Sequence, residues 1–155
     1  MTESTTPVVI AIDTNVLVYA EGEGDAARCG AARRLLARVH PTAVVLPVQV
    51  LGELHRVLTG RFRRDGGVVR EAILGWADAF RVADSSFAAF QSALDLHADR
   101  QLQIWDALIL AVAAEHGCRL LLSEDYPTGF TWRGVTVVDP FASRAHPLLR
   151  QALKH

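Results

Sequence analysis

An apolar run that ends in a carboxylate constrains this chain more than any other feature of its sequence. Residues 8–12 are all apolar and lead directly into Asp13, Thr14 and Asn15. An uninterrupted apolar run of this length is typical of a strand buried on both faces, as in parallel sheets. Asp13 then stands at the carboxyl end of the strand, the edge at which open α/β sheets bind ligands. Taken alone, Asp13 is equally well explained as a turn or helix-cap residue, and Thr14 or Asn15 could cap the following helix.

Strands and helices alternate along the rest of the chain. Short apolar runs predict further strands at residues 43–46, 81–83, 119–122 and 135–138. Apolar residues at helical spacing predict helices from Asp25 to about Val39, after Pro47, and at about 68–80, 87–97 and 105–116. This alternation favours an α/β fold, an α/β/α sandwich with a mostly parallel central sheet. The 155 residues suit a single domain with a core at about 8–141 and a C-terminal appendage at 142–155.

Composition excludes several classes of protein. Half of the residues are hydrophobic and the net charge is −1, which excludes a disordered chain and a protein that coats nucleic acid by bulk charge. Two cysteines, Cys29 and Cys118, are too few for a disulfide framework or a zinc cluster. No apolar run approaches the roughly 20 residues that span a bilayer, and residues 1–7 lack a charged-then-apolar leader. We therefore expect a cytoplasmic protein that does not bind a membrane.

Four carboxylates are expected to converge on one edge of the sheet. Asp13 and Asp125 each follow a predicted strand, and Asp106 lies in the first turn of a helix that is apolar almost all round. Glu53 lies at the margin of the apolar face of the helix after Pro47. Because the carboxyl ends of parallel strands share one edge, these four side chains should lie near one another. They would repel one another unless a cation neutralised them, and hard oxygen ligands suit Mg²⁺ or Mn²⁺.

Each of these acids also has an ordinary structural explanation. Asp106 could be a helix cap and Asp125 a turn residue, while Glu124 is expected to point to solvent. Glu53 is harder to explain, because an acid beside an apolar face without a basic partner is costly to desolvate. The joint pattern favours a site, and we expect that the metal-free site keeps a proton at neutral pH.

Four motifs in order resemble the PIN domain, and more closely the VapC toxins of bacterial toxin–antitoxin pairs. The motifs are Asp13-Thr14-Asn15, Pro47 followed by Glu53, residues 105–109 (WDALI), and residues 123–125 (SED) with Gly129. Residues 134–141 are also similar to the closing strand of that group. The resemblance extends over about residues 8–141, nearly the whole chain.

The resemblance implies a metal-dependent endoribonuclease, the toxin of a toxin–antitoxin pair, that cleaves RNA phosphodiester bonds with a metal-activated water. The residues that it places around Mg²⁺ or Mn²⁺ are Asp13, Glu53, Asp106 and Asp125. Asn15 and Ser123 would support this site through hydrogen bonds. The resemblance also implies a homodimer, and a small antitoxin that inserts a C-terminal segment into the acidic groove.

Arg61, Arg63 and Arg64, beside Phe62, form the best local patch for holding RNA. Arginine pairs with phosphate and aromatic rings stack on unpaired bases, although a solvated surface loop is the alternative. A phosphoacceptor receiver is disfavoured because the only lysine is Lys154. A PIN-like scaffold that binds RNA or protein without cutting remains the alternative function, and the intact set of four acids argues against it.

Overall fold

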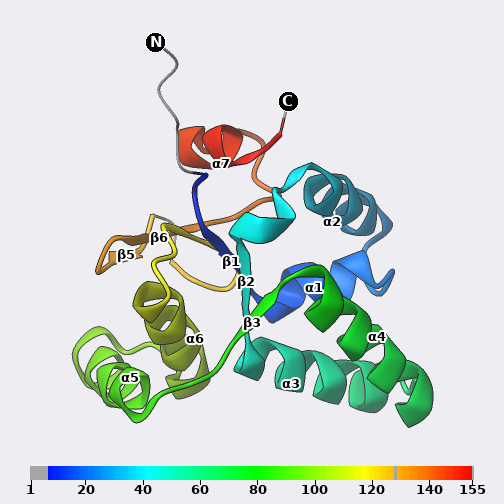
Figure 1. Cartoon of the computed structure of the whole chain (residues 1–155), viewed down its shortest axis with the longest axis horizontal. Helices are drawn as coiled ribbons and strands as arrows, with labels where there is room; N and C mark the ends of the chain where they lie inside the picture. Colours follow the sequence, from blue (N-terminus) through cyan, green and yellow to red (C-terminus); the bar gives the residue numbers. More distant parts are fainter. Residues whose placement is uncertain (1–6, 128, 155) are drawn as a thin grey trace.

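A six-stranded, mostly parallel sheet forms the centre of the protein. The computed structural model describes residues 7–127 and 129–154. The expectation about a leader in residues 1–7 therefore falls outside the described residues, except at Pro7. The strands are β1 (Ile10–Ile12), β2 (Val44–Pro47), β3 (Arg81–Ala83), β4 (Leu120–Leu122), β5 (Thr131–Trp132) and β6 (Val135–Val138). Their order is β3-β2-β1-β4-β6-β5, and only the β5–β6 pair is antiparallel (Figure 1). The predicted α/β fold is confirmed.

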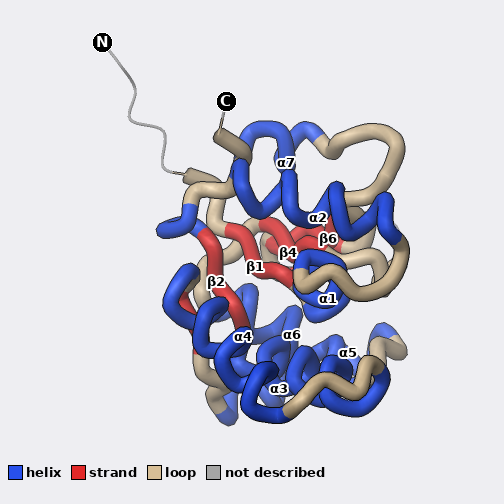
Figure 2. The backbone as a smooth tube through the Cα atoms, turned by 90° about the vertical axis from the view of Figure 1, so that its right-hand side faces the viewer, coloured by secondary structure: helices blue, strands red, loops and turns tan. Residues whose placement is uncertain are grey.

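Helices cover both faces of this sheet. They are α1 (Thr14–Ala20), α2 (Ala26–Arg38), α3 (Val48–Arg56), α4 (Gly66–Ala79), α5 (Phe87–Arg100), α6 (Ile104–Glu115) and α7 (Pro147–Ala152). Figure 2 shows the sheet between α2 and α7 on one side and α3, α4, α5 and α6 on the other. No helix in the described part of the chain is long and apolar enough to cross a membrane.

The register of the two central strands fixes the position of the candidate site. β1 and β4 are fully buried and pair in parallel, with Ile12 opposite Leu122. The backbone N–H of Asp13 donates to the carbonyl oxygen of Leu122 at 2.9 Å, which extends the pairing by one residue. Asp13 and Ser123 therefore leave the sheet side by side at its carboxyl edge.

The structure shows which residues cap two of the helices. Asp13 caps α1, as the helix-cap explanation of this residue predicts, so the other expectation, that Thr14 or Asn15 caps this helix, is wrong. The reason is that Asp13 keeps the extended backbone of β1 while Thr14 is already helical. Gln103 caps α6 with its side-chain oxygen, so Asp106 lies in the first turn with its carboxylate free of a capping role.

The C-terminal segment packs against the body of the protein. Its helix α7 buries Leu149 and Ala152, and Leu153 after it forms an antiparallel bridge with Val39 at the end of α2. Neither α7 nor the short strand β5 was predicted from the sequence. A π-helical turn at Val57–Arg61 continues α3 as far as the first arginine of the predicted RNA-binding patch.

Candidate functional site

Asp13 is the buried centre of the carboxyl edge. Its side chain is held from both sides, since Oδ1 accepts the backbone N–H of Thr14 and Oδ2 accepts the Ser123 hydroxyl, each at 2.7 Å. Asp13 and Ser123 are each only 2% exposed. Two short hydrogen bonds fix the orientation of this carboxylate before any ligand binds.

Burial raises the pKa of Asp13 to about 7. The hydrogen bonds from Ser123 and Thr14 oppose the rise, and the negative charges of Asp106 and Asp125 add to it. Half of the Asp13 side chains therefore carry a proton near neutral pH when no cation is bound. This agrees with the expectation of a retained proton and assigns that proton to the most buried acid of the group.

Asn15 and Ser123 connect Asp125 to this centre. The Asn15 amide donates to Oδ2 of Asp125 at 2.8 Å and to Oγ of Ser123 at 3.2 Å. The Ser123 Oγ also accepts the backbone N–H of Asp125 at 3.1 Å. Ser123 thus contacts both aspartates, and Asn15 orients the more exposed one.

Glu53 and Asp106 approach the same edge from two helices. The Thr14 hydroxyl donates to Oε2 of Glu53 at 3.1 Å, which ties α3 to the start of α1. Burial, together with the charges of Glu53 and Asp125, raises the pKa of the half-buried Asp106 to about 6. The charge of Asp106 is therefore coupled to those of Asp13, Glu53 and Asp125, and Asp13 is also coupled to Asp125.

Tyr126 is a site residue that the sequence analysis missed. Its hydroxyl donates to the backbone carbonyl of Asp106 at 2.7 Å, so it ties the loop after β4 to the first turn of α6. Burial and the charges of all four acids raise its pKa well above the ordinary value for tyrosine. The only sequence signal is an aromatic residue directly after Asp125, which does not reveal a partner twenty residues earlier.

The donor chemistry of this edge suits a hard divalent cation. Among the described residues, no three histidine, cysteine, aspartate or glutamate side chains stand close enough to hold a metal ion between them. Mg²⁺ keeps several of its waters and binds proteins through one or two carboxylates, so it does not need such a closed cage. A carboxylate whose pKa is raised by burial and, to a lesser extent, by its acidic neighbours is the group that a cation would stabilise. The residues present therefore fit Mg²⁺ or Mn²⁺.

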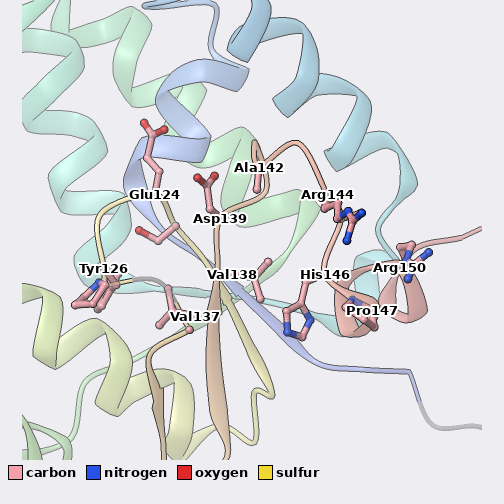
Figure 3. A pocket seen from close by; sticks show the side chains of 14 residues that line it. Glu124, Tyr126, Val137, Val138, Asp139, Ala142, Arg144, His146, Pro147 and Arg150 are labelled. Atoms are coloured by element: carbon pink, nitrogen blue, oxygen red, sulfur yellow. The ribbon is translucent and has the colours of Figure 1, made fainter.

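Two pockets adjoin the acidic edge. One of about 400 Å³ is lined by Asn15, Glu53, Asp125, Arg61 and Phe62, among others. The other, of about 530 Å³, lies between the ends of β4 and β6 and the C-terminal segment. Figure 3 shows Glu124, Tyr126 and Asp139 on one side of this larger pocket and Arg144 and Arg150 on the other.

Two charged residues near the site have intramolecular partners. The Arg64 guanidinium binds Glu21 at 2.8 Å and Glu23 at 2.9 Å, which favours a structural role for this arginine. Glu124 was expected to point to solvent, but it accepts the Tyr19 hydroxyl at 2.6 Å and Nε of Arg28 at 3.1 Å. The expectation was wrong because these partners come from α1 and α2, which the spacing around Glu124 does not reveal.

Arg61 and Arg63 are exposed members of the predicted RNA-binding patch. The Arg61 guanidinium lies over the ring of Phe62, 5.1 Å from its centroid. Arg61 and Phe62 line the 400 Å³ pocket beside Glu53 and Asp125, whereas Arg63 is not among its lining residues. Arg63 has a φ of 53°, in the left-handed region that non-glycine residues seldom adopt. Of the three arginines of the patch, Arg61 is thus the one that lines a pocket together with Glu53 and Asp125.

Fold and site together define a class: a parallel α/β protein whose carboxyl edge gathers acidic residues. The family profile of the PIN domain matches residues 10–126, most of the chain. The chain belongs to the PIN-domain family. No curated protein matches the sequence.

The solved structures to which this chain is similar include toxins of the VapC group. VapC20 from Mycobacterium tuberculosis, described as a toxin that cleaves the sarcin–ricin loop, is 26% identical with a TM-score of 0.63. That match covers 75% of this chain and 91% of VapC20. A toxin–antitoxin complex from Klebsiella pneumoniae shares the fold at 20% identity, a TM-score of 0.61 and coverage of 85% and 98%. FitAcB from Neisseria gonorrhoeae also shares the fold, at 18% identity and a TM-score of 0.63. That match covers 86% of this chain and 99% of the FitAcB chain.

Proposed function

We propose that this protein is a metal-dependent endoribonuclease that hydrolyses RNA phosphodiester bonds and acts as the toxin of a toxin–antitoxin pair. The observation that carries the proposal is the electrostatic coupling of four acids at one sheet edge, around the buried carboxylate of Asp13. Acids that repel one another are concentrated where function requires them. Membership of the PIN-domain family and the similarity to a toxin described as cleaving the sarcin–ricin loop support the same reaction.

The four acids would share the task of holding one or more divalent cations. Asp13 is the rigid member, and Asn15 and Ser123 would keep Asp125 aligned with it. When bound, Mg²⁺ or Mn²⁺ would neutralise the phosphate and lower the pKa of a water for attack at phosphorus. Arg61 is the residue that we expect to pair with a neighbouring phosphate, because its guanidinium lines the pocket beside Glu53.

The pocket of about 400 Å³ is the proposed entry for an antitoxin segment. It is lined by Glu23, Asp25, Glu53, Glu124 and Asp125, which would attract a basic peptide. One similar structure is described as a toxin–antitoxin complex. We propose that a small antitoxin occupies this acidic groove and that the toxin itself is a homodimer.

Cleavage of RNA by the purified protein tests the proposed activity. Both an unstructured RNA and a sarcin–ricin loop RNA serve as substrates, with Mg²⁺ or Mn²⁺ and with chelator. We expect cleavage that chelator abolishes and that Asp13→Asn and Asp106→Asn each reduce by at least about a hundredfold, as removal of a key charged group in an active site does.

Asp95→Asn is the matched control for these substitutions. Asp95 is an exposed carboxylate in the middle of α5, so its loss should leave cleavage unchanged. Cleavage that persists in both site variants would exclude this acidic edge as the catalytic centre. If the folded, metal-loaded and antitoxin-free parent cuts neither RNA nor any transcript in a whole-transcriptome digest, the protein is a scaffold and not a nuclease.

A further inference from the structure

An exposed tryptophan stands directly beside the proposed catalytic edge. Trp105 precedes Asp106 in the first turn of α6 and is 51% exposed. The side chain of Gln103 fixes this turn, because its Oε1 accepts the backbone N–H groups of Trp105 and Asp106 at 2.9 and 3.0 Å. The indole is therefore presented to solvent from a rigid position and not from a mobile loop.

One face of α3 lies opposite this indole. Gln49, Gly52, Glu53 and Arg56 recur at the i, i+3, i+4 and i+7 spacing that places them on one side of a helix. Together with Trp105 they line a pocket of about 320 Å³. No other atom fills the space above Gly52, because a Cβ added there would meet nothing within 4 Å.

Two side chains of this pocket have polar groups without a protein partner in the described part of the chain. Gln49 as a residue is partly exposed, while its Oε1 is buried and has no hydrogen-bond partner among the described residues. Arg56 is exposed and forms no ion pair within the part of the chain that the structure describes. Proteins bind an unpaired nucleotide with these three groups. An aromatic face stacks on the base, a side-chain amide forms hydrogen bonds with the edge of the base, and a guanidinium pairs with a phosphate.

The surroundings of Trp105 favour a nucleotide over an apolar protein surface. Its pocket neighbours are an amide, a carboxylate, a guanidinium and a glycine, and none of them is aliphatic. Apolar side chains surround the aromatic anchors of most protein interfaces. Glu53 belongs both to this pocket and to the coupled acids, so a ligand here lies directly beside the proposed reaction centre.

We propose that Trp105, Gln49 and Arg56 form a subsite for one unpaired nucleobase of the RNA, next to the phosphate that is cut. The base stacks on the indole over Gly52, the Gln49 amide contacts its edge, and Arg56 binds an adjoining phosphate. This subsite rests on the proposed ribonuclease function and deepens it, because it selects RNA in which a base next to the cut is unstacked.

Binding of a short single-stranded RNA to the full chain tests the subsite. The Asp13→Asn background is used so that the RNA is held without being cut, and fluorescence anisotropy gives the Kd. Removing a base-stacking aromatic costs about 1–3 kcal/mol, so we expect Trp105→Ala to weaken binding by roughly 5- to 150-fold. Trp105→Phe keeps a stacking face and should stay within about threefold of the parent.

Phe87→Ala is the matched control. Phe87 is 73% exposed and follows Ser86, whose hydroxyl donates to Glu115 in the last turn of α6 at 2.7 Å. Ten residues of helix, roughly 15 Å, separate that turn from Trp105. Loss of this exposed aromatic should leave the Kd unchanged. The Trp105 indole N–H resonance, assigned with Trp105→Phe, should shift when RNA is added.

Three results would overturn the subsite. The first is unchanged RNA affinity in Trp105→Ala together with an indole resonance that RNA does not shift. The second is a Trp105→Ala variant that falls from dimer to monomer by light scattering while it binds RNA normally, which would assign the indole to a protein interface. The third is no RNA binding by the Asp13→Asn protein. If the parent still cleaves RNA in any of these cases, the subsite fails and the proposed function stands. If the parent neither binds nor cuts RNA, both fail.

Discussion

Asp13 combines two roles that usually fall to different residues. It caps α1 with its carboxylate, and it is the buried acid around which the other three gather. A cap is most useful when charged, whereas a buried acid near other acids is most stable when protonated. This conflict makes Asp13 the residue at which stability and the proposed activity oppose each other.

In metal-free protein, Asp13→Asn should change the dependence of stability on pH. The folded state holds the Asp13 proton up to about pH 7, whereas an unfolded aspartate releases it near its ordinary pKa of 3.8. The folded state therefore binds more protons between these values, so the free energy of unfolding falls as pH rises through this window. Asparagine does not titrate, so the variant does not lose this stability. At pH 8 we expect the free energy of unfolding of the variant to exceed that of the parent by up to about 4 kcal/mol.

Urea unfolding at pH 5 and pH 8 with chelator measures this effect. Asparagine keeps the acceptor for the Thr14 N–H and can donate to Ser123, so the local hydrogen bonds survive. Asp95→Asn should show no such difference between the two pH values. A parent and an Asp13→Asn variant that lose stability equally between pH 5 and pH 8 would contradict the assignment of the proton to Asp13.

At the scale of single residues, the sequence predicted which residues lie at the carboxyl edge of the sheet better than it predicted their hydrogen-bond partners. Asp13 and Asp125 were predicted at one edge because each follows a buried strand and parallel strands end at a common edge, whereas Ser123 was predicted from the resemblance to the PIN domain. The hydrogen bonds from Thr14 to Glu53 and from Tyr126 to Asp106 join different elements. No local pattern encodes such bonds, because they depend on how helices pack and not on the spacing along one helix.

Elements with a strong apolar pattern were predicted from the sequence, whereas β5 and α7 were not. The apolar runs of β1 and β4 and the nearly all-apolar α6 carry a strong signal, because they are buried on most sides. β5 has two residues and α7 has six. Helices this short are not stable by themselves, so only the packing of Leu149, Ala152 and Leu153 on the core creates α7.

Leu149→Ala tests how strongly α7 is attached. Leu149 is 4% exposed, and truncation of a buried leucine to alanine leaves a cavity that costs about 2–5 kcal/mol. We expect a lower unfolding midpoint in urea and faster amide exchange from Leu149 to Leu153. Gln151→Ala, on the exposed face of the same helix, should change neither. Unaltered stability in Leu149→Ala would mean that α7 undocks in solution.

For the whole molecule, divalent cation and proton should compete for the same edge. A ligand that binds only the folded state raises its stability, and carboxylates must lose their protons to bind a metal. The pKa values of Asp13 and Asp106, raised to about 7 and about 6, place this competition between pH 5 and pH 8. We therefore expect Mg²⁺ or Mn²⁺ to raise the melting temperature by several degrees at pH 8 and by little at pH 5.

Scanning calorimetry with and without Mn²⁺ at both pH values checks this prediction. Asp106→Asn removes one of the coupled acids and should lose most of the increase at pH 8, while Asp95→Asn keeps it. Equal increases at pH 5 and pH 8, or an increase that Asp106→Asn retains, would place the bound cation elsewhere on the protein.

The acidic edge is assembled from residues that are far apart in the chain. Asp13 and Ser123 are 110 positions apart, and their contact forms only after β4 has paired with β1. During synthesis, the chain emerges from its N-terminus, so α1, α2 and α3 are made long before the strand that completes the site. A partly synthesised chain therefore has no assembled site. A ribosome that is making this protein is not exposed to the proposed ribonuclease activity until most of the polypeptide has been made.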